Sequence, residues 1–138
     1  MIDHPPPPLG PLVDAVNRHD LDAMAACFSD TYENETPVHP SRGFRGRAQV
    51  RQNWQRIFDG VPDVRADVVR ATVDGPVVWS EWEMSGTRRD GVPHLMRGVI
   101  IFGVTDEVAT WARFYLEPVD LSGDTVHDAV GVAVGPTS

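Results

Sequence analysis

The hydrophobic pattern of this chain changes its period at Pro62, and this change constrains the fold more than any other feature. Before Pro62 the apolar residues recur at helical spacing, whereas after it they alternate with polar residues as in strands. Short connections containing Asp, Gly and Pro separate the alternating runs. Connections of this kind join antiparallel neighbours, so the pattern predicts a four-stranded antiparallel meander. The predicted strands are Val64–Val73, Val77–Thr87, His94–Val104 and Val108–Glu117.

The first part of the chain predicts three helices and one short strand. Apolar spacing indicates a helix over Leu9–Arg18 and a second from Leu21 to Phe28, which Asp20 can cap and Ser29 ends. A short strand follows at Thr31–Thr36, and a third helix at Arg47–Phe58. Helices followed by a meander predict an α+β fold in which three helices cover one face of a curved antiparallel sheet.

Composition divides the chain into three parts. Residues 1–8 form a proline-rich leader, residues 9–119 the folded domain, and residues 120–138 a glycine-punctuated tail. We expect this tail to be loosely ordered unless a partner subunit orders it.

Charge and residue usage exclude several classes of function. The 138 residues carry a net charge of −8, whereas nucleic-acid binding requires clustered cations, so no nucleic-acid partner is expected. All twelve cationic residues are arginines, which excludes chemistry on a lysine Schiff base. The longest apolar run, Val99–Val104, is too short to span a membrane, and the first residues do not resemble a signal peptide. We therefore expect a cytoplasmic protein without a membrane partner.

The last predicted strand places three polar side chains on one face. Arg113, Tyr115 and Glu117 alternate with apolar residues, so they share a face of the sheet. Such a row suits the floor of a pocket in which a carboxylate moves protons. It equally suits a solvated face with a charge pair, and the sequence leaves both interpretations open.

The order of helices and strands resembles the NTF2-like superfamily, and residues 9–119 resemble its SnoaL-like branch. The resemblance is carried by Phe28-Ser29-Asp30, Gly43-Phe44-Arg45-Gly46, Gly86-Thr87 with Asp90-Gly91, and Ile101-Phe102. It implies a cone with a deep pocket between sheet and helices, and a homodimer formed through the sheet.

Two motifs resemble those of limonene-epoxide-hydrolase-like enzymes. Tyr32-Glu33-Asn34 matches their Tyr-x-Asn, and Arg113–Glu117 matches their Arg-Asp-Tyr-Phe-Asp. The resemblance implies that Tyr32 and Asn34 hold a water and that Glu117, oriented by Arg113 and Tyr115, takes its proton. The matching second meander strand, Glu81–Met84, contains no arginine where those enzymes have an Arg-x-Asp pair.

Other members of the superfamily suggest alternatives. Ketosteroid isomerases have a base before a proline, where this chain has Thr36, which cannot act as that base. Polyketide cyclases use an acid and a histidine, a role that Glu117 with His39 or His94 could fill. A pocket that binds its ligand without chemistry is the remaining alternative.

The sequence thus predicts a cofactor-independent enzyme acting on a hydrophobic small molecule of terpenoid or polyketide type, with epoxide hydrolysis as its most specific form. The catalytic residues would be Glu117, Arg113, Tyr32 and Asn34. The substrate-binding residues would be Tyr115, Trp54, Phe58, Trp82, Met84, Met96, Glu83 and His39. Whether Glu81 and Glu83 or Trp82 and Met84 face the pocket is left open. The spacing of the histidines predicts no metal site, and the absence of glycine-rich phosphate motifs predicts no nucleotide cofactor.

Overall fold

The computed structural model describes residues 2–136. The helices are α1 (Leu9–Arg18), α2 (Leu21–Ala25), the 3-10 turn η1 (Pro40–Arg42), α3 (Arg47–Gly60) and α4 (Val126–Val134). The strands are β1 (Phe28–Glu35), β2 (Phe44–Arg45), β3 (Arg65–Asp74), β4 (Val77–Thr87), β5 (Pro93–Thr105) and β6 (Val108–Pro118).

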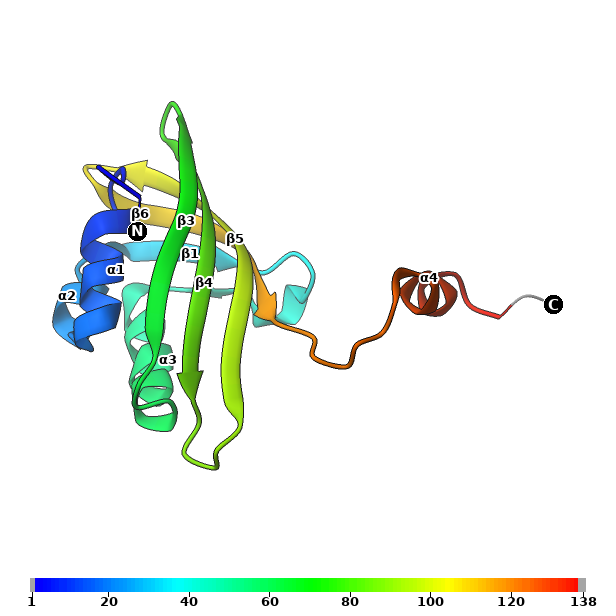
Figure 1. Ribbon diagram of the computed structural model, residues 1–138. Coiled ribbons are helices and arrows are strands. Elements are labelled where there is room, and N and C mark those ends of the chain that lie inside the picture. Colours follow the sequence, from blue (N-terminus) through cyan, green and yellow to red (C-terminus); the bar gives the residue numbers. More distant parts are fainter. Residues whose placement is uncertain (1, 137–138) are drawn as a thin grey trace.

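The six strands form one curved, unclosed sheet in the order β2-β1-β6-β5-β4-β3. The predicted α+β class and the predicted four-stranded antiparallel meander are confirmed. The sheet is mixed, because β1 pairs with β6 in parallel. Helices α1, α2 and α3 lie on one side of the sheet, and the core fills the space between them (Figure 1).

Helix α1 has the predicted bounds and is attached to the sheet by side chains at its C-terminal end. The Asn17 amide donates to the carbonyl of Ala66 at 3.0 Å and accepts from its N–H at 2.7 Å. The ring of His19 stacks on Phe58 at a centroid distance of 4.6 Å and contacts the carbonyl of Val64 at 3.0 Å. These contacts hold the C-terminal end of α1 against the start of β3 and against the C-terminal end of α3.

The second helix is shorter than predicted. Asp20 caps it as expected, accepting from the Ala23 N–H at 3.0 Å, but the helix ends at Ala25. Phe28 was predicted to lie on the helix and instead begins β1, where it pairs with Ala109. A contact distant in sequence thus overrides the local helical spacing.

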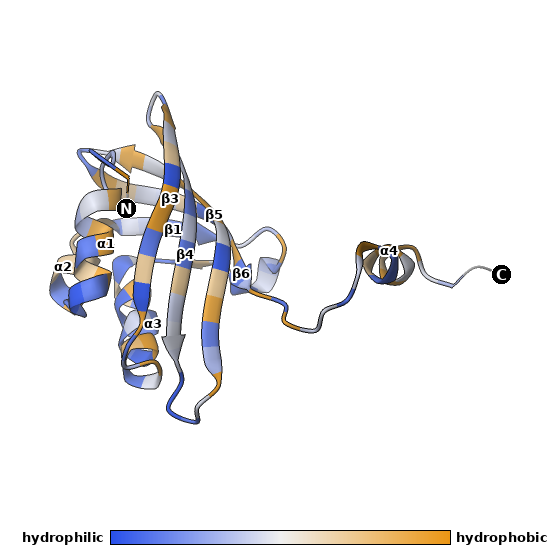
Figure 2. Cartoon of the chain, viewed as in Figure 1, coloured by the Kyte–Doolittle hydropathy of each residue, from blue (hydrophilic) through white to orange (hydrophobic). Residues whose placement is uncertain are grey.

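Alternation along the meander separates two faces. Residues that face the helices on β4 and β5 are buried, among them Ser80, Trp82, Ile100 and Phe102. The opposite face, here called the outer face, carries charged side chains in pairs such as Arg70 with Glu81 and Arg97 with Glu83. Hydrophilic and hydrophobic bands alternate along β3, β4 and β5 in Figure 2.

The C-terminal helix α4 stands apart from the rest of the molecule (Figure 1). A capping box between Thr125 and Asp128 begins it, and its residues are exposed. The expectation that residues 120–138 form a loosely ordered tail, unless a partner subunit orders them, stays a prediction, and residues 137–138 lie outside the described part of the chain. None of the helices in the described part of the chain is long and apolar enough to cross a membrane.

Gly98 allows β5 and β6 to approach closely where the sheet curves. Its φ is +152°, and a Cβ there would lie 2.1 Å from the carbonyl oxygen of Tyr115. A side chain at this position would have to push the two strands apart.

We predict that Gly98→Ala lowers the free energy of unfolding by about 1–3 kcal/mol through overpacking. Urea unfolding monitored by tryptophan fluorescence measures the change. The matched control is Gly60→Ala, because a Cβ on Gly60 meets nothing within 4 Å. Equal effects of the two substitutions would show that the strand contact at Gly98 is not what restricts this position.

Candidate functional site

A cavity of about 290 Å³ lies between the helices and the inner face of the sheet. This volume is just below the range of small-ligand sites, which is roughly 300–1,000 Å³. Most of its wall is apolar, built from residues of α1, α2, α3 and every strand except β3. The apolar lining residues are Leu12, Val16, Met24, Phe28, Phe44, Val50, Trp54, Ile57, Trp82, Met84, Met96, Ile100, Phe102, Phe114 and Leu116.

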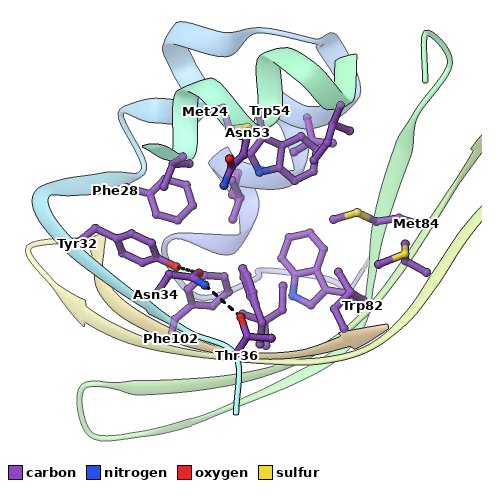
Figure 3. Close-up of a pocket in the computed structure, with 18 of the residues that line it drawn as sticks. Met24, Phe28, Tyr32, Asn34, Thr36, Asn53, Trp54, Trp82, Met84 and Phe102 are labelled. Atoms are coloured by element: carbon purple, nitrogen blue, oxygen red, sulfur yellow. Dashed lines mark hydrogen bonds between the residues drawn. The ribbon is translucent and has the colours of Figure 1, made fainter. Parts of the chain in front are cut away.

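Three polar side chains, Tyr32 and Asn34 of β1 and Thr36 directly after it, form a track along one wall of the cavity, and Figure 3 shows Asn34 between Tyr32 and Thr36. The Tyr32 hydroxyl donates to Asn34 Oδ1 at 2.8 Å, and Asn34 Nδ2 donates to Thr36 Oγ1 at 3.4 Å. Tyr32 is 0% exposed and Asn34 7%, whereas Thr36 is half-buried. The track therefore runs from the core toward solvent.

The hydrogen bonds of this track leave donors free toward the cavity. An amide has two N–H groups, and the bond to Thr36 uses one of those of Asn34. The Thr36 hydroxyl accepts in that bond, so its own proton is also available. Burial raises the pKa of Tyr32, which keeps its hydroxyl protonated and donating to Asn34. A bound oxygen acceptor would satisfy the remaining donors.

Asn53 on α3 supplies another amide across the cavity from the track (Figure 3). Gln49 Nε2 donates to Asn53 Oδ1 at 2.8 Å, which occupies the acceptor end of the amide. Its N–H groups form no hydrogen bond within the described part of the chain. This residue therefore adds donors to the cavity rather than acceptors.

Trp82 forms an apolar part of the cavity wall, because its one polar group, the indole N–H, already has a hydrogen-bond partner in the protein. Its indole N–H donates to Ser80 Oγ at 2.8 Å, and the Ser80 hydroxyl donates to the carbonyl of Ile100 at 2.7 Å. Both side chains are 1% exposed. The ring of Trp82 therefore presents carbon to a ligand.

Arg42 and His94 line the part of the cavity that opens to solvent, since Arg42 is exposed and His94 half-buried. Burial, reinforced by the positive charge of Arg88, lowers the pKa of His94 below its usual 6.5. The imidazole is therefore neutral at pH 7 and can accept or donate one hydrogen bond. We call these two residues, together with Thr36, the rim.

Glu117 faces away from this cavity, which corrects the expectation that it lies beside Tyr32 and Asn34. The β5–β6 register places it opposite Arg97 on the outer face, with Phe114 and Leu116 directed inward. Its carboxylate contacts His39 Nε2 at 3.0 Å, and its side chain is 35% exposed. His39 is likewise absent from the cavity wall.

Three further expected site residues also lie on the outer face. Arg113 pairs with Glu35 at 2.9 Å and contacts the hydroxyl of Tyr115 at 3.5 Å. Glu83 lies opposite Arg97, with 4.0 Å between their charged atoms. On β4 it is Trp82 and Met84 that face the cavity, which settles the orientation that the sequence left open.

Where the epoxide-hydrolase pattern has a carboxylate at a position that faces the cavity, this chain has an apolar residue. In Arg-Asp-Tyr-Phe-Asp the first Asp matches Phe114, which faces inward, and the last matches Glu117, which does not. Trp82 and Met84 face inward where that pattern has Arg-x-Asp. Among the described residues, the cavity wall contains neither Asp nor Glu.

Six of the expected site residues do meet in the cavity, namely Tyr32, Asn34, Trp54, Trp82, Met84 and Met96. Phe58 lies behind the wall, buried against His19 and 5.6 Å from the ring of Trp54. Sequence reasoning missed Asn53 and Arg42. Asn53 lies three residues after Val50 and four before Ile57, so helical spacing places it on the cavity face of α3, and this spacing is the signal that could have revealed it.

A family model for the SnoaL-like domain matches residues 11–117. The chain belongs to the SnoaL-like domain family. The fold and the resemblance expected from the sequence are therefore confirmed. Membership supports either a small-molecule enzyme or a small-molecule-binding domain. A comparison with curated proteins found no match.

Solved structures share the fold of this SnoaL-like domain at low identity. An LEH-like epoxide hydrolase from M. tuberculosis is 19% identical with a TM-score of 0.69, covering 91% of this chain and 92% of its own. IdmH from Streptomyces antibioticus, a candidate polyketide cyclase, is 19% identical with a TM-score of 0.68, covering 79% and 88%. A protein with a ketosteroid isomerase-like fold from Catenulispora acidiphila, in complex with trimethylamine, is 16% identical with a TM-score of 0.69, covering 88% of this chain and 91% of its own. At these identities the likeness shows the fold alone.

No cluster of three or more His, Cys, Asp or Glu side chains that could hold a metal ion occurs among residues 2–136. The expectations of no metal and no cofactor stay predictions.

We predict that His94 titrates below pH 6.5, because its charged form is disfavoured by burial and by Arg88. Its contribution to stability is then fully present above about pH 6.5 and is lost as the pH falls through the folded-state pKa. A histidine NMR titration measures this pKa, with Arg88→Gln as the control that should raise it. A folded-state pKa at or above 6.5 contradicts the prediction.

Proposed function

We propose that this SnoaL-like domain binds a compact hydrophobic small molecule that carries an oxygen acceptor. The observation that supports this most strongly is the cavity itself, which is apolar except for hydrogen-bond donors on β1 and α3 and a cationic rim. Apolar surface supplies most of the binding free energy of such a ligand, at about 25 cal/mol per Å² buried. The free N–H of Asn34 then selects and orients the oxygen.

A carbonyl or ether oxygen fits these donors better than a hydroxyl does. Asn34 Oδ1, the acceptor nearest the centre of the track, already accepts from Tyr32. A ligand hydroxyl could accept a hydrogen bond from the donors of the track, but its own proton would find fewer acceptors there. We infer that, among neutral polar groups, the cavity prefers a ketone or an ester of a terpenoid or polyketide-like molecule.

Epoxide hydrolysis by a carboxylate ranks below this proposal. It requires an acid within about 2.6–3.2 Å of the water held by Tyr32 and Asn34. Glu117 is instead on the outer face beside His39. Tyr32 and Asn34 can bind an oxygen, but the described cavity wall gives that oxygen no carboxylate to which it could lose a proton.

The second candidate is an isomerase or cyclase in which His94 accepts a proton from a carbon next to the ligand carbonyl. The lowered pKa of His94 keeps the imidazole in its neutral form at pH 7, and only this form can accept a proton. Donors at Asn34 would stabilise the enolate oxygen that forms. In that case His94→Gln abolishes turnover while leaving ligand affinity within about twofold. Equal loss of affinity and turnover would instead assign His94 to binding.

The expected homodimer stays a proposal. The outer face offers Trp79, which is 47% exposed and lines a surface hollow together with Val99 of β5. Exposed aromatic surface of this kind is typical of protein interfaces. The cytoplasmic location likewise stays a prediction of the sequence.

We predict that the cavity prefers 2-acetylnaphthalene over naphthalene by roughly three- to tenfold, the range for one net hydrogen bond. Asn34→Leu should remove this preference while retaining naphthalene binding, because it deletes the donor and keeps an apolar side chain. Quenching of tryptophan fluorescence reports binding, since Trp54 and Trp82 line the cavity.

Tyr32→Phe is the matched control for that experiment. It deletes the hydroxyl that donates to Asn34 but leaves the Asn34 N–H groups in place. It should therefore keep the preference for the ketone. The proposal fails if neither compound binds, or if Asn34→Leu leaves the ketone preference unchanged.

A further inference from the structure

The arginines of this chain are paired almost everywhere except at the mouth of the cavity. Eight of the twelve form ion pairs with carboxylates, and Arg89 donates to the carbonyl of Asp59 at 2.5 Å. The eight are Arg18, Arg45, Arg47, Arg51, Arg70, Arg88, Arg97 and Arg113. Within residues 2–136 this leaves Arg42, Arg56 and Arg65 as the arginines whose guanidinium groups have neither an ion pair nor a hydrogen bond.

Two of these three unpaired guanidinium groups lie at the cavity mouth. Arg42 lines the cavity itself, and Arg56 lines an adjoining hollow that shares Asn53, Ile57 and His94 with it. The chain has twenty acidic residues against twelve basic ones, so carboxylates are plentiful. The described part of the cavity wall contains none, and the positive charge there is not neutralised within the described residues.

Arg42 continues the polar track of β1 to the surface. Thr36 is the outermost of the three residues of the track. The chain then turns back through η1, whose last residue is Arg42, and Phe44 pairs with Asn34. Exposure increases in the order Tyr32, Asn34, Thr36, Arg42. A ligand bound along this track thus contacts neutral donors at its inner end and a full positive charge at the rim.

We propose that the natural ligand is an amphipathic carboxylic acid, whose hydrophobic body fills the cavity and whose carboxylate binds Arg42. The guanidinium fork matches a carboxylate in geometry as well as charge. At the rim both charges keep part of their hydration, so the ion pair forms without the desolvation penalty of a buried pair. Arg56 adds positive potential across the shared hollow, and neutral His94 offers a further N–H. This inference rests on the proposed ligand-binding function and names the charge of its ligand.

The experiment compares three compounds that share one ring system and differ in charge: 2-naphthoate, 2-acetylnaphthalene and 2-naphthylmethylammonium. Isothermal titration calorimetry with the full chain at pH 7.5 and low salt measures each affinity. The carboxylate should bind roughly tenfold or more tightly than the ketone, as a charge-assisted hydrogen bond implies, and the ammonium more weakly. Raising the salt concentration should weaken binding of the carboxylate only, through screening.

Arg42→Gln should remove the advantage of the carboxylate over the ketone. Arg65→Gln is the matched control, because it deletes another unpaired arginine that lies away from this cavity. It should change neither affinity by more than about twofold. Thermal unfolding of both variants checks that the fold is retained.

The outcomes separate the charge of the ligand from the binding function. If the ketone binds but the carboxylate binds no more tightly, the inference is overturned and the proposed function stands. Equal losses in Arg42→Gln and Arg65→Gln would also overturn it, by showing only a long-range effect of net charge. If Asn34→Leu rather than Arg42→Gln removes the advantage of the carboxylate, its charge lies deep on the track and the assignment to Arg42 is wrong. If none of the three compounds binds, the proposed function fails together with the inference.

Discussion

The parallel pairing of β1 with β6 is the constraint on which the site depends. It places Asn34 beside Ala112 on the inner face and Glu35 beside Arg113 on the outer face. Side chains alternate along both strands, so this one register sends the polar track of β1 and the apolar residues of β6 into the same cavity. A shift of one residue would bring Arg113 and Glu117 inside and expel Phe114. The cavity is apolar because of this register.

The sequence predicted the elements well because their signals are local. The bounds of α1 and β4 follow from spacing and turn residues over short windows. The end of α2 could not be predicted, because Phe28 joins β1 through its pairing with Ala109, far along the chain. The predicted orientation of Glu117 was wrong for a related reason. Alternation shows which residues share a face of the sheet, but not which face the helices cover. The small and apolar side chains of Ala112, Phe114 and Leu116 were the better guide to the inner face.

The two faces of the sheet differ in the charge of their side chains. On the outer face, acidic and basic side chains alternate across neighbouring strands and neutralise one another, as Arg70 and Glu81 do. The inner face carries no acid in its described cavity wall and ends in an unpaired arginine. Buried polar groups there are neutral amides and hydroxyls, which need partners but no counter-ion. The chain thus keeps its net negative charge away from the ligand.

His94 and Arg42 both line the mouth of the cavity, where no carboxylate among the described residues of the wall offsets positive charge. Burial lowers the pKa of His94, and the charge of Arg88 lowers it further. Arg42 lines the same cavity without a carboxylate among residues 2–136. A neutral ligand would leave the positive potential there unchanged, and a cation would increase it. A bound anion would lower the electrostatic energy of Arg42 and at the same time favour protonation of His94, so ligand charge and the ionisation of the rim are thermodynamically linked.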